Sequence, residues 1–296
     1  MLDLRVETFL CVWKNRSYSR ASEELYITQP AVTQHIQYLE RHYNSKFFDY
    51  SNRKLKLTKA GQLFYKYAIS AKVAEKAITD KLHEINGKSK KLSFAATLTI
   101  GEFTLAPLLA DFIKTFSGYD VTMYVDNTET VLEMLEKGEI TFALVEGLFN
   151  KGDYETRLLK TASFILIAPV HHRLATKESI SLEDLKGETI ILREKGSGSR
   201  EILERGLFDK NYTLEHFGNI IEIGNVNVIK NMVKNGIGLS FMYKDAAIRE
   251  IREGLLREVV ISDFVLEREF NFIHLRNDIV QDEVDMFFSF FHDVGL

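Results

Sequence analysis

The chain has 296 residues, of which 45% are hydrophobic and 27% charged, enough for two or three domains with cores of their own. No apolar run approaches the roughly 18 residues of a membrane span, and the first ten residues, which include Asp3 and Glu7, lack a signal-peptide core. The single cysteine, Cys11, excludes an internal disulfide and a cysteine-built metal site. We therefore expect a cytoplasmic protein with no membrane association.

The net charge of −4 is divided unevenly along the chain. Residues 1–60 hold ten basic and six acidic side chains, a net charge of +4, and residues 61–296 hold twenty-eight and thirty-six, a net charge of −8. A modestly basic N-terminus on an acidic body is typical of a DNA-binding module joined to a second part. Surface charge varies freely between proteins, so the asymmetry carries little weight alone.

The first sixty residues predict three helices, at 2–14, 19–25 and 29–43. We expect Ser19 to cap the second helix and Thr28 to cap the third, because hydroxyl oxygens accept from the free N–H groups of a first turn. A short corner without good helix formers separates the two. This arrangement predicts a pair of small amphipathic helices that cross.

The third helix has one apolar and one polar side. Its expected buried stripe is Ala31, Val32, Ile36 and Leu39. Its expected open face is Gln29, Thr33, Gln34 and Gln37. Side chains that both donate and accept hydrogen bonds suit the edges of bases in a DNA major groove, although a solvated helix face is the simpler interpretation of the spacing.

The amino-acid pattern around these helices is more specific than their spacing. It comprises Phe9, Val12, SYSRAS at 17–22, Leu25, ITQPAVT at 27–33, Ile36, Leu39, Glu40, Phe48, Leu57, Thr58, Ala60 and Gly61. This block resembles the winged helix-turn-helix of LysR-type transcriptional regulators. The resemblance implies DNA contacts from Ser19, Arg20, Thr28, Gln29, Pro30, Thr33, Gln34, Gln37, Arg53 and Lys54.

Residues 47–50 and 54–57 predict the two strands of a wing, with 51–53 as its turn. Asn44 stands where the family usually has glycine, and asparagine tolerates the left-handed conformation that ends a helix. Gln34 and Gln37 stand where basic residues are common. These departures leave the expected fold intact.

A long helix is predicted from 58 to 85. One row of heptad positions is Phe64, Ala71, Ile78 and Ile85, and the companion row is Ala68, Glu75 and Leu82. One interpretation is a helix packed on its own domain. We favour a dimer-forming linker, as the resemblance also implies, with domain bounds of 1–60 for DNA binding and 61–88 for the linker helix and its polar hinge.

Beyond the hinge, strands and helices alternate. Strands are expected at 92–96, 121–125, 142–145, 164–168, 190–192, 220–223, 239–242 and 270–274, and helices at 103–116, 128–137, 201–207, 226–234, 244–253 and 282–292. Such alternation predicts largely parallel α/β sheets with ligands at the carboxyl ends of strands. The resemblance implies an effector-binding domain at 89–296 with two α/β lobes, as in periplasmic binding proteins: lobe I at 89–162 and 267–296, lobe II at 163–266.

Two segments could bind a small anion. Thr97, Leu98 and Thr99 join a strand to a helix N-terminus, where N–H groups and hydroxyls favour negative charge; plain helix capping is the alternative. The loop at 193–200 offers Gly196, Ser197, Ser199 and Arg200, without the ending of a phosphate-binding P-loop or the spacing of a nucleophile elbow. The resemblance adds that threonines at 97 and 99 contact effectors in relatives, and that such loops suggest a small anionic metabolite.

Further polar residues follow other strands and could line the same cleft. They are Asn127, Thr128, Glu146, Gly147, Asn225 and Asn227. For each one alone, a helix cap or a turn is the favoured interpretation. The histidines show no metal-ligand spacing, and no group of residues defines a reaction, so we expect no catalytic residues, no bound metal and no cofactor.

The sequence therefore predicts a two-part chain: a winged helix-turn-helix, a long linker helix and a two-lobed α/β domain. Its expected function is that of a sequence-specific transcriptional regulator controlled by a small metabolite. Expected partners are double-stranded DNA, the effector and a second copy of the chain, as a homodimer or homotetramer, with RNA polymerase left open. The rivals are a metabolite-processing enzyme or a solute-binding module that carries an accessory DNA-binding arm.

Overall fold

The computed structural model describes residues 2–51, 54–86, 89–276 and 279–294. The chain forms two compact units. The first consists of residues 1–88 with the short segments 136–138 and 276–281, and the second of residues 89–135, 139–275 and 282–296.

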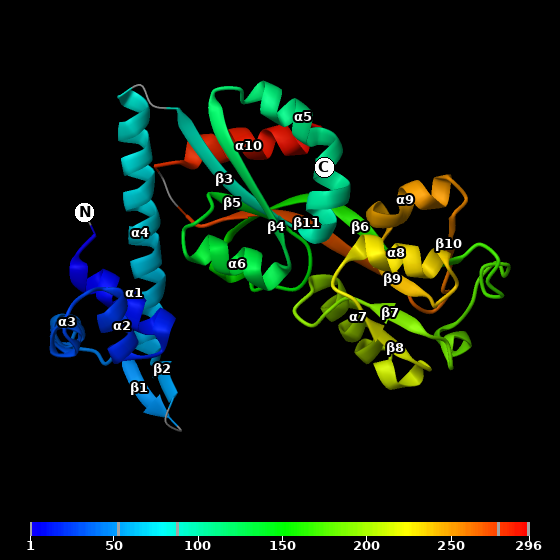
Figure 1. The fold of residues 1–296 in the computed structure, drawn as a ribbon, viewed down its shortest axis with the longest axis horizontal. Coiled ribbons are helices and arrows are strands. Elements are labelled where there is room, and N and C mark those ends of the chain that lie inside the picture. The colour runs from blue at the N-terminus through cyan, green and yellow to red at the C-terminus, as the bar shows by residue number, and fades with distance from the viewer. Residues whose placement is uncertain (1, 52–53, 87–88, 277–278, 295–296) are drawn as a thin grey trace. The chain divides into compact units, whose positions relative to one another are not determined.

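The N-terminal unit contains α1 (Leu4–Asn15), α2 (Tyr18–Glu24), α3 (Gln29–His42), β1 (Phe48–Ser51), β2 (Lys54–Leu57) and α4 (Lys59–Ile85) (Figure 1). Thr28 caps α3 as predicted, with its hydroxyl accepting from the Ala31 N–H at 3.3 Å. The cap of α2 is Ser17, which accepts from the Arg20 N–H, so the predicted cap at Ser19 is wrong. Ser17 has the extended backbone that a capping residue needs, whereas Ser19 lies inside the helix.

Aromatic rings fill the core of this unit. Phe9 of α1 packs edge-on against Phe47 and Phe64, with ring centroids 5.6 and 4.8 Å apart. The buried stripe of α3 is confirmed for Val32, Ile36 and Leu39, while Ala31 is half-buried. The core thus fixes which side of α3 faces outward.

The predicted heptad rows of α4 are partly wrong. Phe64 and Ala68 are buried in the core of the N-terminal unit, and the Glu75 carboxylate accepts from the Leu2 N–H at 2.7 Å, so these three are not at a free seam. The exposed apolar side chains are Leu63, Tyr67, Ile78, Leu82 and Ile85. They lie within a stripe of about 100° at 3.6 residues per turn.

The second unit is built on a seven-stranded sheet in the order β10-β6-β11-β5-β3-β4, with β9 also paired to β6. Its strands are β3 (Lys90–Thr97), β4 (Tyr119–Asp126), β5 (Phe142–Val145), β6 (Glu155–Pro169), β9 (Ser240–Tyr243), β10 (Leu256–Val259) and β11 (Leu266–His274). Only β3 pairs in parallel, with β4 and β5, and the other pairs are antiparallel. The prediction of largely parallel sheets is therefore wrong for this sheet.

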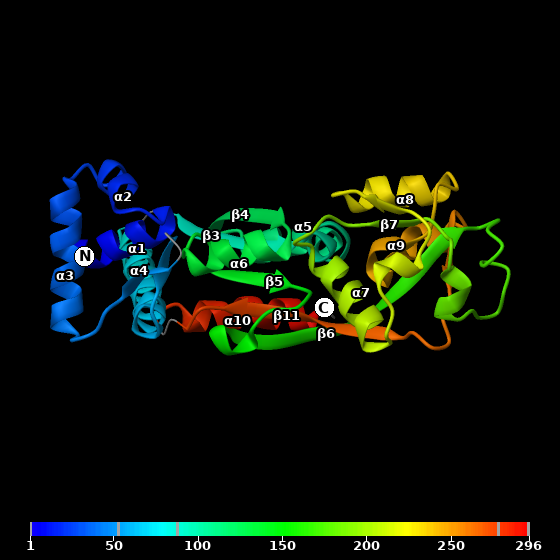
Figure 2. The ribbon, with the colours of Figure 1, turned by 90° about the horizontal axis from the view of Figure 1, so that it is seen from below.

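Two long antiparallel strands join the lobes of this unit (Figures 1 and 2). In their register Ala162 of β6 lies opposite Arg268 of β11, and Ser163 lies opposite Glu267. A small parallel sheet of β7 (Ile190–Leu192) and β8 (Ile220–Glu222) belongs to the second lobe. The helices are α5 (Ala106–Thr115), α6 (Thr128–Glu136), α7 (Gly198–Asp209), α8 (Val226–Lys234), α9 (Lys244–Arg252) and α10 (Gln281–Asp293).

Several elements differ from the sequence prediction. The helix expected at 103–116 begins as a π-helical turn, η1 (Ile100–Leu105), before α5. Strand β10 was not predicted, because its sequence LREV lacks a clear alternation. Helix α7 begins at Gly198, so Ser199 and Arg200 lie on a helix and not in the loop where they were expected. Within the described residues no helix has the length and apolar character of a membrane span.

Each lobe has its own core. In lobe I the rings of Phe94, Phe112, Phe142 and Phe291 stack or tilt against one another, with Phe94 and Phe142 stacked at 4.9 Å. In lobe II aliphatic side chains of α8 and α9 cover the strands. Burial of a large apolar side chain contributes about 2 kcal/mol, so each of these clusters stabilises its own lobe.

Candidate functional site

The outward side of α3 carries the predicted polar residues. Gln29, Gln34 and Gln37 are exposed, and half-buried Thr33 donates to the Gln29 carbonyl at 3.0 Å. Pro30 is exposed in the first turn, where it removes no helical hydrogen bond. The helix therefore exposes three side-chain amide groups on one side and packs apolar side chains into the core on the other.

Helix α2 supports the start of this polar side. Ser19 and Arg20 are both exposed at its N-terminal end. The Ser19 hydroxyl donates to the Gln29 side-chain oxygen at 3.2 Å, which orients the amide group without burying it. The pair Ser19 and Gln29, ten residues apart in sequence, thus forms one hydrogen-bonding surface.

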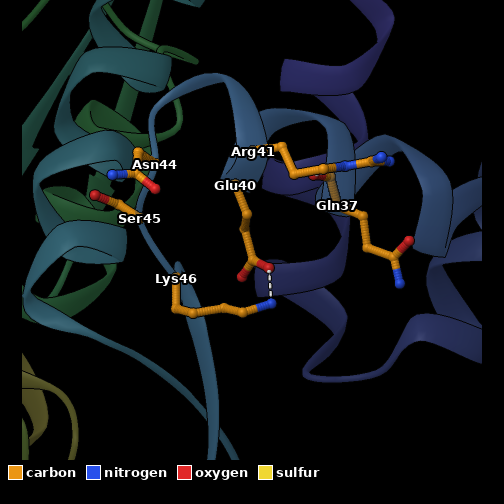
Figure 3. Close-up of a pocket in the computed structure, with 6 residues that line it drawn as sticks. All are labelled: Gln37, Glu40, Arg41, Asn44, Ser45 and Lys46. Carbon is orange, nitrogen blue, oxygen red and sulfur yellow. Dashed lines mark hydrogen bonds and ion pairs between the residues drawn. The ribbon is translucent and has the colours of Figure 1, made fainter.

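A buried carboxylate joins α3 to the wing. Glu40 is 8% exposed, and one of its oxygens accepts from the N–H groups of Phe47 and Phe48 at 2.9 and 3.5 Å. Its other oxygen lies 2.7 Å from the Lys46 ammonium, and Figure 3 shows the two groups turned toward each other. Glu40 therefore fixes the direction in which the chain leaves α3 and enters β1.

Beside this junction lies a surface hollow of about 500 Å³, lined by Gln37, Glu40, Arg41, Asn44, Ser45 and Lys46 (Figure 3). Asn44 has φ of 46°, which confirms the predicted left-handed residue after α3. Arg41 and Lys46 are exposed cations that the sequence analysis did not select. Lys54 is exposed at the start of β2, and the predicted contact Arg53 lies outside the described residues.

In lobe I the predicted effector residues meet at the ends of β3 and β5. Thr97, Thr99, Thr128 and Glu146 are all buried. The Glu146 N–H donates to the Thr97 hydroxyl at 3.4 Å, and the Thr128 hydroxyl donates to the Glu146 carbonyl at 3.2 Å. Half-buried Leu98 lies between the two threonines of the first segment. The structure thus brings three predicted segments together.

Glycines allow lobe II to approach this group closely. A Cβ on Gly147 would lie 2.9 Å from Gly198 Cα, and one on Gly198 would lie 2.6 Å from Thr128 Oγ1. Gly147 and Gly196 have φ of 105° and 85°, a backbone conformation that favours glycine. Any larger residue at Gly198 would push the lobes apart at this point.

The start of α7 contributes hydroxyl groups. Ser197 and Ser199 are buried, and their hydroxyls lie 2.9 Å apart. Arg200 was expected to add positive charge to the ligand site, but it is bound within lobe II. Its guanidinium pairs with Glu204 at 2.8 Å and with Glu222, and donates to the Arg193 carbonyl at 3.1 Å. The structure therefore gives Arg200 a role in holding the loop in place.

The three predicted asparagines lie at helix starts. Asn127 accepts from the Thr130 N–H at 2.9 Å, and Asn225 accepts from the Val228 N–H at 3.0 Å, which are capping bonds. Asn227 is exposed and donates to Glu102 of η1 at 3.1 Å, a bond between the lobes. Ligand contact by these three residues stays a prediction.

Glu146 has a strongly raised pKa at the junction of the lobes. Burial raises the pKa of its carboxyl to about 7, and hydrogen bonds from Thr99 together with the charge of Arg193 oppose that rise. Burial also raises the pKa of the Tyr243 hydroxyl, with a further contribution from Glu146. The sequence analysis missed Tyr243 and Arg193, since a tyrosine ending a strand and an arginine following one carry no motif.

The two units together define a class of protein: a winged helix-turn-helix for DNA joined to a two-lobed domain of the kind that binds small molecules. The sequence profile of the LysR substrate binding domain matches residues 86–295, and that of the bacterial regulatory helix-turn-helix protein, lysR family, matches residues 4–62. The chain belongs to the LysR family of transcriptional regulators. It is thus a DNA-binding transcriptional regulator with an effector-binding domain, as predicted.

Several relatives agree along nearly the whole chain. The HTH-type transcriptional regulator CysL of Bacillus subtilis is 29% identical over 91% of this chain and 89% of its own length. The RuBisCO operon transcriptional regulator of Allochromatium vinosum is 27% identical over 92% and 89%.

Solved structures share the fold. Full-length LysG of Corynebacterium glutamicum with bound effector Arg matches 99% of this chain and 97% of its own, with a TM-score of 0.66 and 15% identity. The regulatory domain of CcmR from Synechocystis in complex with 2-PG matches 69% of this chain and 97% of its own, with a TM-score of 0.62 and 24% identity. The two-lobed architecture is thereby confirmed.

Proposed function

We propose that this regulator recognises a dyad-symmetric DNA site with the polar side of α3. The observation that carries the proposal is the exposed row of Gln29, Gln34 and Gln37 on a helix whose opposite side is locked into the core. Bidentate amide groups at this position distinguish base pairs in the major groove. The proposed contacts are Ser19, Arg20, Thr28, Gln29, Pro30, Thr33, Gln34, Gln37, Arg53 and Lys54, and we add Arg41 and Lys46 as phosphate contacts.

We also propose that the chain acts in the cytoplasm as a homodimer or a tetramer and catalyses no reaction. The exposed apolar side chains of α4 support a dimer, because a second α4 would remove them from water. Two α3 helices related by a two-fold axis would then read two half-sites. We keep the bounds 1–60, 61–88 and 89–296 as the proposed domains, and the division at 162/163 and 266/267 as the proposed lobes.

Control by a small molecule bound between the lobes is the second part of the proposal. It is supported by the meeting of Thr97, Thr99, Thr128 and Glu146 of lobe I with Gly196, Ser197 and Ser199 of lobe II. A ligand that prefers one arrangement of the lobes shifts the population toward it by its difference in affinity. We propose that this small metabolite carries an anionic group, and the complex of CcmR with 2-PG supports that proposal.

The DNA contact is tested with a Gln29→Ala, Thr33→Ala double variant. We expect at least a tenfold loss of affinity for the specific site, since each good base contact contributes about 1–3 kcal/mol of discrimination. Gln62→Ala, Thr79→Ala is the matched control, because Thr79 also donates to the carbonyl four residues earlier, at 2.8 Å on α4. Full sequence-specific affinity in the first variant would refute the assignment of α3.

The effector site is tested with Thr97→Ala and Ser199→Ala. A thermal-shift screen of sulfur, nitrogen and organic-acid metabolites first identifies a binder, because a ligand of the folded state stabilises it by mass action. Both variants should then lower calorimetric affinity for that binder while leaving DNA binding without ligand intact. Exposed Thr176→Ala serves as the control. Unchanged affinity in both variants would refute this site.

A further inference from the structure

Glu146 presents a buried acceptor at the junction of the lobes. The residue follows β5 directly and is 4% exposed. Its backbone groups are satisfied by Thr97 and Thr128, and Thr99 donates to its carboxylate. Its second carboxylate oxygen, Oε2, has no hydrogen-bond partner among the described residues. A buried carboxylate oxygen without a donor is costly, so a site that keeps one calls for a partner.

The neighbouring side chains do not supply that partner. Arg193 lies within electrostatic range, but its Nε and Nη2 atoms donate to the Glu194 carboxylate at 2.7 Å each. Tyr243, at the end of β9, is fully buried, and its hydroxyl also lacks a partner among the residues that the structure describes. Arg268 and Asp245, of opposite sign, act on Tyr243 in turn. Among the described residues, the junction therefore holds a carboxyl oxygen and a tyrosine hydroxyl that both lack a hydrogen-bond partner and lie within electrostatic range of each other.

The N-terminus of α7, close to Glu146, carries hydrogen-bond donors that could bind an anion. The N-terminal turn of α7, a twelve-residue helix, carries buried Ser197 and Ser199. Their mutual hydrogen bond uses one hydroxyl hydrogen and leaves the other to donate. Gly147, the residue after Glu146, lies so close to Gly198 at the same turn that an added Cβ would come within 2.9 Å of the Gly198 Cα. Donors for an anion and an acceptor for a cation thus lie within the length of one small molecule.

We propose that the effector is zwitterionic: an anionic group bound at Ser197 and Ser199, and a protonated amine bound by the Glu146 carboxylate in the neighbourhood of the Tyr243 hydroxyl. The proposal rests on the effector site proposed above and names the chemical class that fits it, an α-amino acid or a derivative that keeps its amino group. Carboxylates recognise ammonium groups through charge-assisted hydrogen bonds, which are about twice as strong as neutral ones.

A purely anionic effector would interact with the protonated form of Glu146, whereas an amine would interact with the ionised form. Binding of the two kinds of effector should therefore move protons in opposite directions. Glu146 with a pKa of about 7 is partly protonated at neutral pH. An ammonium group favours the ionised carboxylate, so its binding releases up to about half a proton at pH 7. An anion favours the protonated carboxyl as a donor, so its binding takes up as much as about half a proton at pH 7.

The experiment is calorimetry on the full-length chain with pairs of probes that differ in one group. Each pair is an amino acid and its 2-hydroxy acid: L-serine with L-glycerate, L-aspartate with L-malate, and L-glutamate with L-2-hydroxyglutarate. We expect the amino acid of at least one pair to bind at least tenfold tighter than its partner. Titrations in buffers of different ionisation enthalpy should show proton release near pH 7.

Substitutions distinguish the contribution of Glu146 to ligand affinity from that of the other residues of the site. Glu146→Gln should weaken binding of the preferred amino acid at least tenfold, abolish proton release and change hydroxy-acid binding less than threefold. Tyr243→Phe should weaken the same amino acid about threefold or more. Glu215→Gln, at an exposed glutamate, should change nothing.

Tighter binding of hydroxy acids, proton uptake, or undiminished amino-acid binding in Glu146→Gln would overturn the proposal while leaving a metabolite-controlled regulator in place. Failure of every probe to bind would also overturn it. The proposed function fails separately, if the metabolite screen finds no ligand or the chain does not bind specific DNA.

Discussion

The two units each place a buried glutamate at a junction, and the two carboxylates differ in what surrounds them. Glu40 lies between α3 and the wing, where two backbone N–H groups and the Lys46 ammonium occupy both of its oxygens. Glu146 lies between the lobes, where one oxygen has no partner among the described residues. The same side chain is thus completed by the fold in one unit and left incomplete in the other.

This difference follows from where each unit binds its ligand. DNA approaches an exterior surface, so the groups that position α3 can be fully satisfied in its absence. A small effector enters between packed elements, so some of its hydrogen-bonding partners stay buried and unmet until it arrives. A buried carboxylate with all its hydrogen bonds formed stabilises the fold. A buried carboxylate that lacks one lowers the free energy of unfolding but keeps an acceptor for the ligand.

Glu40→Ala should have the largest effect on stability. It removes the acceptor of the Phe47 and Phe48 N–H groups and leaves a cavity, so we expect a loss of about 4 kcal/mol in the free energy of unfolding. The only tryptophan, Trp13, lies on α1, so its fluorescence during urea unfolding reports on the N-terminal unit. A loss below about 1 kcal/mol would show that Glu40 does not hold the wing.

Glu146→Gln should raise the free energy of unfolding, by an amount that depends on pH. The pKa of this carboxyl is about 7 in the folded chain and 4.5 ordinarily, so the folded state holds more protons between these values and stability falls as pH rises through them. Glutamine removes that fall. The stability gained over the unchanged chain should be near zero at pH 4 and approach about 3 kcal/mol at pH 8.

Scanning calorimetry across this pH range measures the gain in the effector-binding unit. The Trp13 transition should stay unchanged, because that side chain reports on the other unit. Exposed Glu215→Gln should give a difference that does not vary with pH. A Glu146→Gln variant less stable than the unchanged chain at pH 8 would show that its carboxylate is satisfied after all.

Tyr243→Phe tests the effect of a buried polar group that carries no charge, in contrast to Glu146. The tyrosine ring packs edge-on against Phe164 and Phe270, with centroids 5.2 and 5.0 Å apart, and phenylalanine keeps both contacts. The substitution removes only the buried hydroxyl, which has no partner in the described part of the chain, so we expect a gain of about 1.5 kcal/mol in the free energy of unfolding without ligand. Calorimetric unfolding at pH 5 and pH 8 checks this. A loss of stability would indicate a partner for the hydroxyl.

The sequence predicted many local features of both units, with the cap of α2 misplaced from Ser17 to Ser19, and it missed features that depend on tertiary contacts. Helix caps and short buried strands depend on neighbouring residues, so Thr28, Asn44 and the strand at 142–145 were predicted correctly. Strand direction in the large sheet depends on how β6 and β11 return, which no local pattern encodes. Likewise the commitment of Arg200 to Glu222, and the isolation of Tyr243, follow from elements far apart in the chain.

The smallest expected effect comes from the corrected cap of α2. Ser17→Ala removes the hydroxyl that accepts from the Arg20 N–H at 3.3 Å, near the surface, where water partly replaces it. We expect a loss of about 0.7 kcal/mol in the Trp13 transition, within the range of capping serines. Ser19→Ala is the matched control: it should leave that transition within about 0.3 kcal/mol and affect DNA affinity instead, because Ser19 orients Gln29. The reverse pattern would restore Ser19 as the cap and remove it from the DNA-binding surface.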